Sequence, residues 1–468
     1  MVDWLVAASY FLSALLSAVA LACCFALTLH WVRNREEGLL PYVFYTVYFV
    51  VAVGVYLSDR NLQTSSQLSL APSPRPDLVV WASRASSMFI LLAAMERIAR
   101  YMIKRGRESS PPTLLLLAFC LYFLTNIVSA AALGTYPTFS HEFIYPLLAG
   151  CAALLVTSPA GDAAVRSARN ALYVFLFISA ACIAWKPELV LMRGYQGVIP
   201  GFDVRYAGLG SHPNALGSMV VTFLLCLWVR PYRLNWLNAA AWLIGGASLI
   251  LTQSKTSWVA FAVCAFCIAY FKRPASVTSR SAATRHLQRA SGFLAAAATI
   301  TTAAIVLGIV GVESLGVLEE IRVGNDLWTL SGRDLIWQAA LEEWRANPLF
   351  GYGLNIWNDD YRTRLGLPEA FHAHNQFYQA LASAGLLGVS GLVIYTLILV
   401  RFALTTANES EGLSLALVAL ILIRSISEVP LAIGSFGPEQ LTHLLMLMVI
   451  ASYWPQRSMS REPERVLC

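Results

Sequence analysis

The sequence predicts an all-α fold, a polytopic transmembrane helical bundle of about 12–13 spans with one large loop subdomain. Hydrophobic residues make up 57% of the 468 residues and charged residues only 13%, whereas soluble globular domains carry about 25% charged residues. The mean hydropathy is +0.60. Apolar runs near the roughly 20 residues that a helix needs to cross a bilayer recur along the whole chain. This composition excludes a disordered chain and a nucleic-acid-binding protein, and it argues against a soluble enzyme.

The apolar runs give the expected helices in chain order. The run at 142–157 is short, and the last two runs are separated only by Pro430 and the stretch 434–437, so the number of spans is open by one or two. The expected spans are 5–32, 39–58, 78–103, 113–134, 142–157, 170–186, 210–229, 236–252, 256–271, 290–312, 375–400, 412–430 and 438–454.

Basic loops set the expected orientation, because Lys and Arg concentrate in cytoplasmic loops of membrane proteins. The segment 272–289 holds five Lys or Arg residues and no acid, so we place it in the cytoplasm. Counting spans from there also places 33–38, 104–112, 158–169, 230–235 and 401–411 inside, and each contains Lys or Arg. The opposite, outer face then holds 59–77, 135–141, 187–209, 253–255, 313–374 and a short loop near 431–437.

The outer segment 313–373 carries ten acids and five arginines and is expected to be a small subdomain. Within it, Ser331 resembles a helix N-cap, and Trp337, Leu341 and Trp344 follow at helical spacing, which predicts an amphipathic helix that ends before Pro348. The expected organisation is 1–200, N-terminal transmembrane helices; 201–312, further transmembrane helices; 313–373, the loop subdomain; 374–455, C-terminal transmembrane helices; and 456–468, a cytoplasmic tail.

Polar clusters on the outer face are the candidate functional residues. Four stand at helix entries or in the outer loop: Arg205 to Gly217, Ser254-Lys255-Thr256, Gly332-Arg333 with Gly351-Tyr352-Gly353, and His372-Ala373-His374-Asn375. Arg424 lies near the outer end of its span. Several cations and a histidine on one face of a bundle that is otherwise poor in charge indicate a shared site.

Each of these residues also has a plain structural interpretation. Arg205 and Lys255 can extend their charged ends to the membrane interface. His212-Pro213-Asn214 and His374-Asn375 can be helix caps. Arg424 and Glu428 are four residues apart and can form an ion pair along one helix. Arg333 is different, because a cation at a helix N-terminus opposes the helix dipole and therefore favours an anionic partner.

The order and spacing of these clusters resemble the bacterial O-antigen ligase and polysaccharide polymerase superfamily. The resemblance runs from about Tyr206 to Gly388 and rests on G-x-H-P-N-x-L-G (Gly210 to Gly217), S-K-T (Ser254 to Thr256), S-G-R-x-x-x-W (Ser331 to Trp337), P-L-x-G-Y-G (Pro348 to Gly353) and A-H-N with a later glycine (Ala373 to Gly385). Lys255 departs from the arginine that family members often have there, and it lacks the bidentate guanidinium fork.

The resemblance implies a membrane glycosyltransferase of the bacterial inner membrane. It would move a glycan from an undecaprenyl diphosphate-linked donor to an acceptor sugar hydroxyl on the periplasmic side, with no metal and no cofactor. His374 would be the general base, and Arg205 and Arg333 would stabilise the leaving diphosphate. The expected donor- and substrate-binding residues are Lys255, His212, Asn214, Asn375, His372, Tyr352 and Arg424.

Three alternatives stay open at this point. A ligase would use lipid A-core as acceptor, whereas a polymerase would use another acceptor glycan, and the two share the same donor. A polysaccharide or lipid flippase is the alternative of another class, but transporters place ionisable groups near the membrane midplane, and here they stand at helix ends. Metal chemistry would need converging carboxylates, and the adjacent pair Asp359-Asp360 is a weak candidate.

Overall fold

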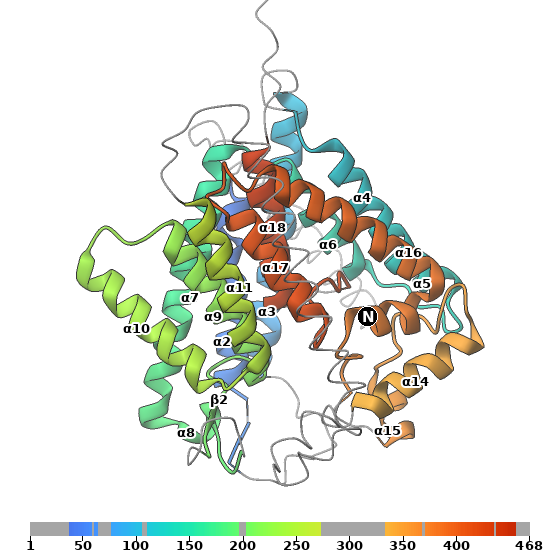
Figure 1. Ribbon diagram of the computed structural model, residues 1–468. Helices are drawn as coiled ribbons and strands as arrows, with labels where there is room; N and C mark the ends of the chain where they lie inside the picture. Colours follow the sequence, from blue (N-terminus) through green and yellow to red (C-terminus); the bar gives the residue numbers. More distant parts are fainter. Residues whose placement is uncertain are drawn as a thin grey trace, which may run out of the picture.

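The computed structural model describes residues 37–58, 60–63, 76–104, 110–195, 203–272, 333–366, 370–434 and 437–454 (Figure 1). The expected spans 5–32 and 290–312, the tail 456–468 and the proposed helix cap Ser331 lie outside these residues.

The described chain is almost entirely helical, and its two strands, which are two residues long each, pair antiparallel with Leu191 opposite Tyr206. The elements are η1 (Leu40–Tyr42), α2 (Val43–Tyr56), α3 (Asp77–Ile103), α4 (Thr113–Phe123), η2 (Leu124–Val128), α5 (Ser129–Leu133), η3 (His141–Phe143), α6 (Ile144–Leu154), α7 (Ser158–Trp185), α8 (Pro187–Val190), β1 (Leu191–Met192), β2 (Arg205–Tyr206), α9 (Pro213–Val229), α10 (Asn235–Leu251), α11 (Lys255–Phe271), α14 (Arg333–Ala346), α15 (Asp359–Leu365), α16 (Gln376–Thr405), α17 (Leu413–Ser425) and α18 (Pro438–Tyr453).

The all-α, multi-pass membrane fold is confirmed. Within the described residues, four helical stretches are long and apolar enough to cross a bilayer: α3, Thr113–Leu133, α7 and α16. Shorter apolar helices at Leu40–Tyr56, α9, α10, α11 and α17 pack with them around a continuous core of buried aliphatic and aromatic side chains. Every expected span inside the described residues contains a helix, because apolar length is a strong signal in a chain whose solvent is lipid.

Several helix boundaries differ from the expectation, and one of them changes the interpretation of the site. Helix α7 begins at Ser158, well before the predicted residue 170, because the polar first turns of this helix extend beyond its apolar run. Helix α17 ends at Ser425, whereas the apolar run predicts a span to residue 430. Glu428 therefore lies in a loop, and the ion pair of Arg424 is with Glu439 of α18. The predicted pair between Arg424 and Glu428 along one helix is wrong.

Helix α16 is interrupted where the loop 348–353 approaches it. Gly385 has a backbone φ of +62° inside the helix, and a Cβ atom there would lie 2.5 Å from the carbonyl of Leu349. The freed backbone groups of α16 bond to the loop instead: Tyr352 N–H donates to Ala382 O at 2.8 Å, and Leu386 N–H donates to Pro348 O at 2.9 Å. Two of the sequence motifs thus meet directly, and glycine is needed because the backbones are in contact.

The loops gather into two groups at opposite ends of the bundle, as the alternation of expected loops predicts. One end, which we call the motif end, carries α8, β2, α14 and α15 (Figure 1) together with the loop after α17. The opposite end carries an ion-pair network in which Arg230 contacts Asp162 at 2.8 Å, Glu411 at 2.9 Å and the Tyr453 hydroxyl at 2.7 Å. Arg166 and Lys272 extend this network. The network ties together helix ends that are far apart in sequence.

Candidate functional site

Glu428 lies at the centre of a polar cluster at the motif end, and its side chain is only 8% exposed. Oε1 accepts a hydrogen bond from Asn214 Nδ2 at 3.3 Å and lies 4.0 Å from the Arg333 guanidinium. Oε2 lies 3.4 Å from His372 Nε2 and 3.3 Å from His374 Nδ1. One carboxylate therefore joins α9, α14 and the segment before α16, which the sequence predicts to share a face.

Arg205 connects this cluster to the turn between α10 and α11. Its Nε donates to Thr252 O at 2.8 Å, and its NH2 donates to Asn214 Oδ1 at 2.6 Å. The guanidinium also covers the ring of Tyr195 at 4.7 Å. Because Asn214 donates to Glu428 with its other amide end, Arg205 orients Asn214, and Asn214 in turn orients the central carboxylate.

His212 and Asn375 cap the helices that enter the cluster. The Nδ1 atom of His212 accepts from Asn214 N–H at 3.2 Å at the start of α9. Asn375 Oδ1 accepts from the N–H groups of Phe377 and Tyr378 at the start of α16, and its Nδ2 donates to Ile426 O at 3.2 Å. The capping interpretation is correct for both residues, and Asn375 also fixes the loop that carries Glu428.

The two neighbouring histidines have different proton positions. His372 Nδ1 accepts a hydrogen bond from the His374 backbone N–H at 3.1 Å, so the neutral ring of His372 carries its proton on Nε2, which faces Glu428. Nδ1 of His374 is buried and lies 3.3 Å from Glu428 Oε2, and it has no hydrogen-bond partner within the described residues. A carboxylate at this place favours the proton of His374 on Nδ1 and leaves Nε2 as the basic nitrogen.

His374 has a backbone φ of +48°, in the left-handed region that few non-glycine residues adopt. Such a conformation costs about 1–3 kcal/mol and persists where the surroundings enforce it. Here the bond to His372 on one side and the cap by Asn375 on the other hold the residue. The strained backbone directs the His374 ring toward Glu428.

Charge and burial determine the ionisation of the cluster. Burial alone would raise the pKa of Glu428, but the contact with His374 and the charge of Arg424 lower it more, so that its net pKa lies well below the usual range. Burial and the neighbouring His374 lower the pKa of His372 to about 4. At neutral pH Glu428 is therefore an anion and His372 is a neutral hydrogen-bond donor.

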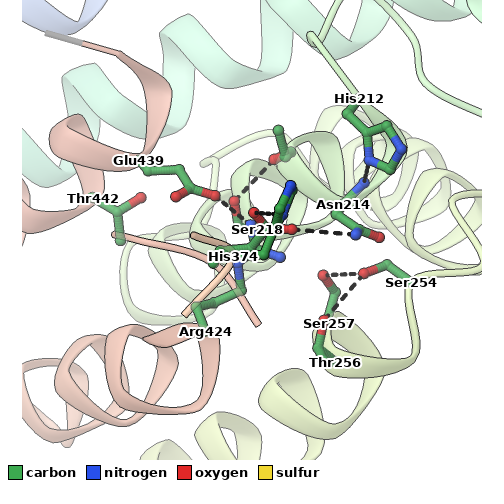
Figure 2. A network of polar contacts seen from close by, with 12 residues as sticks. His212, Asn214, Ser218, Ser254, Thr256, Ser257, His374, Arg424, Glu439 and Thr442 are labelled. Carbon is green, nitrogen blue, oxygen red and sulfur yellow. Dashed lines mark hydrogen bonds and ion pairs between the residues drawn. The ribbon is translucent and has the colours of Figure 1, made fainter. Parts of the chain in front are cut away.

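Arg424 is 1% exposed and forms an ion pair with Glu439 of α18. Its Nε and NH1 atoms have no hydrogen-bond partner within the described residues. Figure 2 shows Asn214, His374, Arg424 and Glu439 gathered in one place, although they come from four different segments of the chain. Arg424 thus adds a second buried cation beside the central carboxylate.

Two predicted site residues lie outside this set of contacts. Lys255 begins α11 and has no polar contact within the described residues, while its neighbours Ser254 and Ser257 bond to each other at 2.9 Å. Gly217 of α9 packs on these serines, and a Cβ atom there would lie 2.4 Å from Ser257 Oγ. Tyr352 is 5% exposed and packs against Tyr136 and Tyr361 in the core of the loop subdomain.

The cluster contains a set of potential metal ligands. His372, His374 and Glu428 offer ligand atoms within 4.8 Å of one another. A histidine that binds a metal normally donates its other ring N–H, whereas the second ring nitrogen of His372 accepts a hydrogen bond. That bond places a proton on Nε2 of His372, the atom that would have to face the metal. Asp359, the other metal candidate, is 68% exposed and pairs with Arg362.

Sequence reasoning missed three residues. Glu428 was missed as the centre of the cluster because α17 ends before the apolar run does and leaves this residue in a loop. Glu439, in the first turn of α18, was missed as the partner of Arg424. Arg60 was missed because its loop matches no motif, although this side chain donates to four backbone carbonyls, two of which belong to the residues directly before His212. Glu428 carries a detectable signal, since an acid at the end of an apolar run is rare.

Comparison with known proteins gives two findings. Residues 239–393 match the family model described as O-antigen ligase. The chain is also 28% identical over 268 residues to the exopolysaccharide production protein ExoQ of Rhizobium meliloti (strain 1021). That alignment covers 49% of this chain and 56% of the relative, so the chain spans about half the length of that protein. The resemblance inferred from the motifs is confirmed by both comparisons.

Proposed function

We propose that this chain, a membrane glycan enzyme of the O-antigen ligase and polysaccharide polymerase type, transfers a glycan from undecaprenyl diphosphate to an acceptor sugar hydroxyl. The observation that carries the proposal is the cluster of His374, Glu428, Arg333 and Asn214, which joins distant motifs at one end of the bundle. The proposed location is the inner membrane, with the motif end facing the periplasm.

His374 is the proposed general base. Its Nε2 takes the proton of the acceptor hydroxyl while the acceptor oxygen attacks the anomeric carbon of the donor sugar. The bond between that carbon and the diphosphate oxygen breaks, and undecaprenyl diphosphate leaves with the bonding electrons. Attack opposite the leaving group inverts the anomeric carbon. Glu428 orients the imidazole and stabilises the imidazolium that forms, and such base catalysis contributes typically about 10²–10⁴-fold.

Arg333 is the proposed partner of the leaving diphosphate. Its contact with Glu428 at 4.0 Å is its only polar contact within the described residues, so several of its N–H groups are available to a ligand. Negative charge on the diphosphate grows as the glycosidic bond breaks, and a positioned cation therefore stabilises the transition state more than the ground state. Arg205 adds positive charge, and its hydrogen bonds indicate that it mainly orients Asn214.

The proposed reaction needs no metal. The proton on His372 Nε2 supports this part of the proposal, because that atom faces the carboxylate as a donor. We expect a chelator to leave the transfer unchanged. A loss of activity on chelation that added metal restores would instead favour the ligand set His372, His374 and Glu428.

The substitution His374→Ala tests the proposed base. The variant should insert and fold normally and lose glycan transfer from a polyprenyl diphosphate donor by at least about 10²-fold, since base catalysis is worth that much. The matched control is His141→Ala, which changes an exposed histidine of η3. Full transfer by the folded His374→Ala protein would contradict the proposal.

The acceptor separates the two activities within this class. The name of the relative, an exopolysaccharide production protein, favours a polymerase that joins glycan units to one another, whereas the family model is described as a ligase. A strain that lacks the protein distinguishes them. Single-repeat products would indicate a polymerase, and free polymer that is not attached to lipid A-core would indicate a ligase.

A further inference from the structure

The side chain of Arg60 reaches from the loop after α2 to helix α8 and to the loop 207–211 at the motif end. Its Nε and NH2 donate to Leu189 O at 3.1 and 2.5 Å, and NH2 also donates to Gly208 O at 2.7 Å. NH1 donates to Gly210 O at 2.6 Å and to Ser211 O at 3.3 Å. All three guanidinium nitrogens are therefore used on backbone carbonyls, with no acidic side chain of the described residues among the acceptors.

Arg60 is not the sole support of the loop 207–211, because the side chains of Ala207 and Leu209 are buried and three of the loop's N–H groups are hydrogen-bonded to residues outside the loop. Gly208 and Gly210 make the backbone of 207–211 permissive, and Gly208 has a φ of +52°. The other bonds to the loop come from Ser179, which accepts from Leu209 N–H at 3.1 Å, and from Val190, whose carbonyl accepts from Ala207 and Gly208. The carbonyls of Gly208, Gly210 and Ser211 are all bound by one guanidinium, whose planar fork suits several acceptors at once.

The loop connects two residues of the candidate site. It begins directly after the strand that holds Arg205 and ends at His212, the cap of the helix that carries Asn214. Because Arg205 bonds to Asn214 and Asn214 bonds to Glu428, the conformation of the loop sets where the central carboxylate is held. Arg60 lies in the loop after α2, in the N-terminal part of the chain, to which the motifs assign no role.

We infer that Arg60 is a positioning residue of the candidate active site, acting through the loop 207–211 on Arg205, Asn214 and Glu428. It does not touch the reacting groups. The catalytic half of this inference rests on the proposed glycan transfer. The structural half, that Arg60 orders the loop, can be measured without any substrate.

Hydrogen–deuterium exchange of the full-length protein in detergent tests the structural half. In Arg60→Ala the amides of 207–211 should exchange at least about tenfold faster than in the wild type, while peptides from the opposite end, around Arg230, keep their rates. Arg84→Ala is the matched control, because Arg84 is exposed and, within the described residues, contacts the ring of Trp81 of its own helix. Unchanged exchange at 207–211 in folded Arg60→Ala would overturn the inference.

Steady-state kinetics test the catalytic half. Misplacement of a site by about 1 Å can cost 10²-fold, so we expect kcat of Arg60→Ala to fall about 10- to 100-fold with little change in the KM for the acceptor. Arg60→Lys keeps the charge but has one ammonium group for four carbonyls, so its kcat should lie between those of the wild type and Arg60→Ala. This variant replaces Arg60→Ala in the test if Arg60→Ala does not fold. Faster loop exchange with unchanged kcat would refute positioning. If the wild type transfers no glycan, the proposed function fails, and exchange still decides whether Arg60 orders the loop.

Discussion

The substitution Glu428→Gln removes the charge at the centre of the cluster while keeping the shape of the side chain. In the wild type, Oε1 accepts from Asn214, and Oε2 faces Nε2–H of His372 and Nδ1 of His374. All three partners present donors. An amide has one oxygen and one NH2 group, so in either orientation the substituted side chain would turn an N–H group toward a donor.

The size of the effect follows from this mismatch. In the transition state the His374 ring becomes an imidazolium, and its 3.3 Å contact with Glu428 tightens to a hydrogen bond between charged groups. Such a bond contributes about 1.5–3 kcal/mol, and 1.36 kcal/mol corresponds to a tenfold change in rate. If the new amide keeps the bond to Asn214, the contact that orients His374 is lost, and kcat should fall by about 10- to 100-fold. The donor and acceptor KM values should change less, because the charge acts on the base and the imidazolium that forms in the transition state.

The assay is glycan transfer by the purified protein from a polyprenyl diphosphate-linked donor, with products separated by size. Glu142→Gln is the matched control, since Glu142 is an exposed acid in η3. Gel filtration and thermal unfolding of both variants establish that they are folded. A folded Glu428→Gln protein with wild-type kcat would refute the reasoning that Glu428 supports His374.

Three further predictions concern the leaving group, the pH dependence of stability and the broken helix. Arg333→Ala should lower kcat/KM for the donor by at least about tenfold with the acceptor KM unchanged, and equal losses for donor and acceptor would contradict a role at the diphosphate. The pKa of Glu428 is depressed in the folded protein, so its stabilising contribution is present above the ordinary carboxyl pKa of about 4.3 and is lost as the pH falls through the lower folded value. The melting temperatures of wild type and Glu428→Gln, measured at pH 3–8, should therefore differ by a constant amount above about pH 5, and this difference should shrink in more acidic buffer. A difference in melting temperature that grows in acid would contradict a lowered pKa of Glu428. Gly385→Ala should destabilise the protein by roughly 3 kcal/mol, because it combines a positive φ with a contact to Leu349. Gly246→Ala should not, because no atom of the described residues lies within 4 Å of a Cβ there.

The helices could be predicted from the sequence because apolar length is nearly sufficient to define a helix in lipid. The alternation of loops also predicted which segments meet, and residues from three of the four polar clusters expected on the outer face are found together around Glu428. Asn375 was identifiable as a cap because Asn is a preferred residue before a helical run. His212 was identifiable because it directly precedes Pro213, and proline is common at the first position of a helix.

The contacts within the cluster could not be predicted in the same way. Arg424 and Glu428 have the spacing of a helical ion pair, but α17 ends at Ser425, and both side chains then find partners on other elements. The hydropathy of the sequence does not show that α17 ends at Ser425, because the residues that follow remain largely apolar. The carbonyls that Arg60 binds are backbone atoms, which carry no side-chain signature.

The central position of Glu428 has a practical consequence for chimaeric proteins. Exchanging the outer loop with that of a homologue is a direct way to ask where acceptor preference resides. The graft would bring its own residues at positions 333 and 372, whereas the carboxylate that receives them belongs to the host. Such hybrids should be active when the grafted loop supplies residues at positions 333 and 372 that can contact Glu428 of the host. A graft that ends before residue 333 would leave these contacts of the host unchanged.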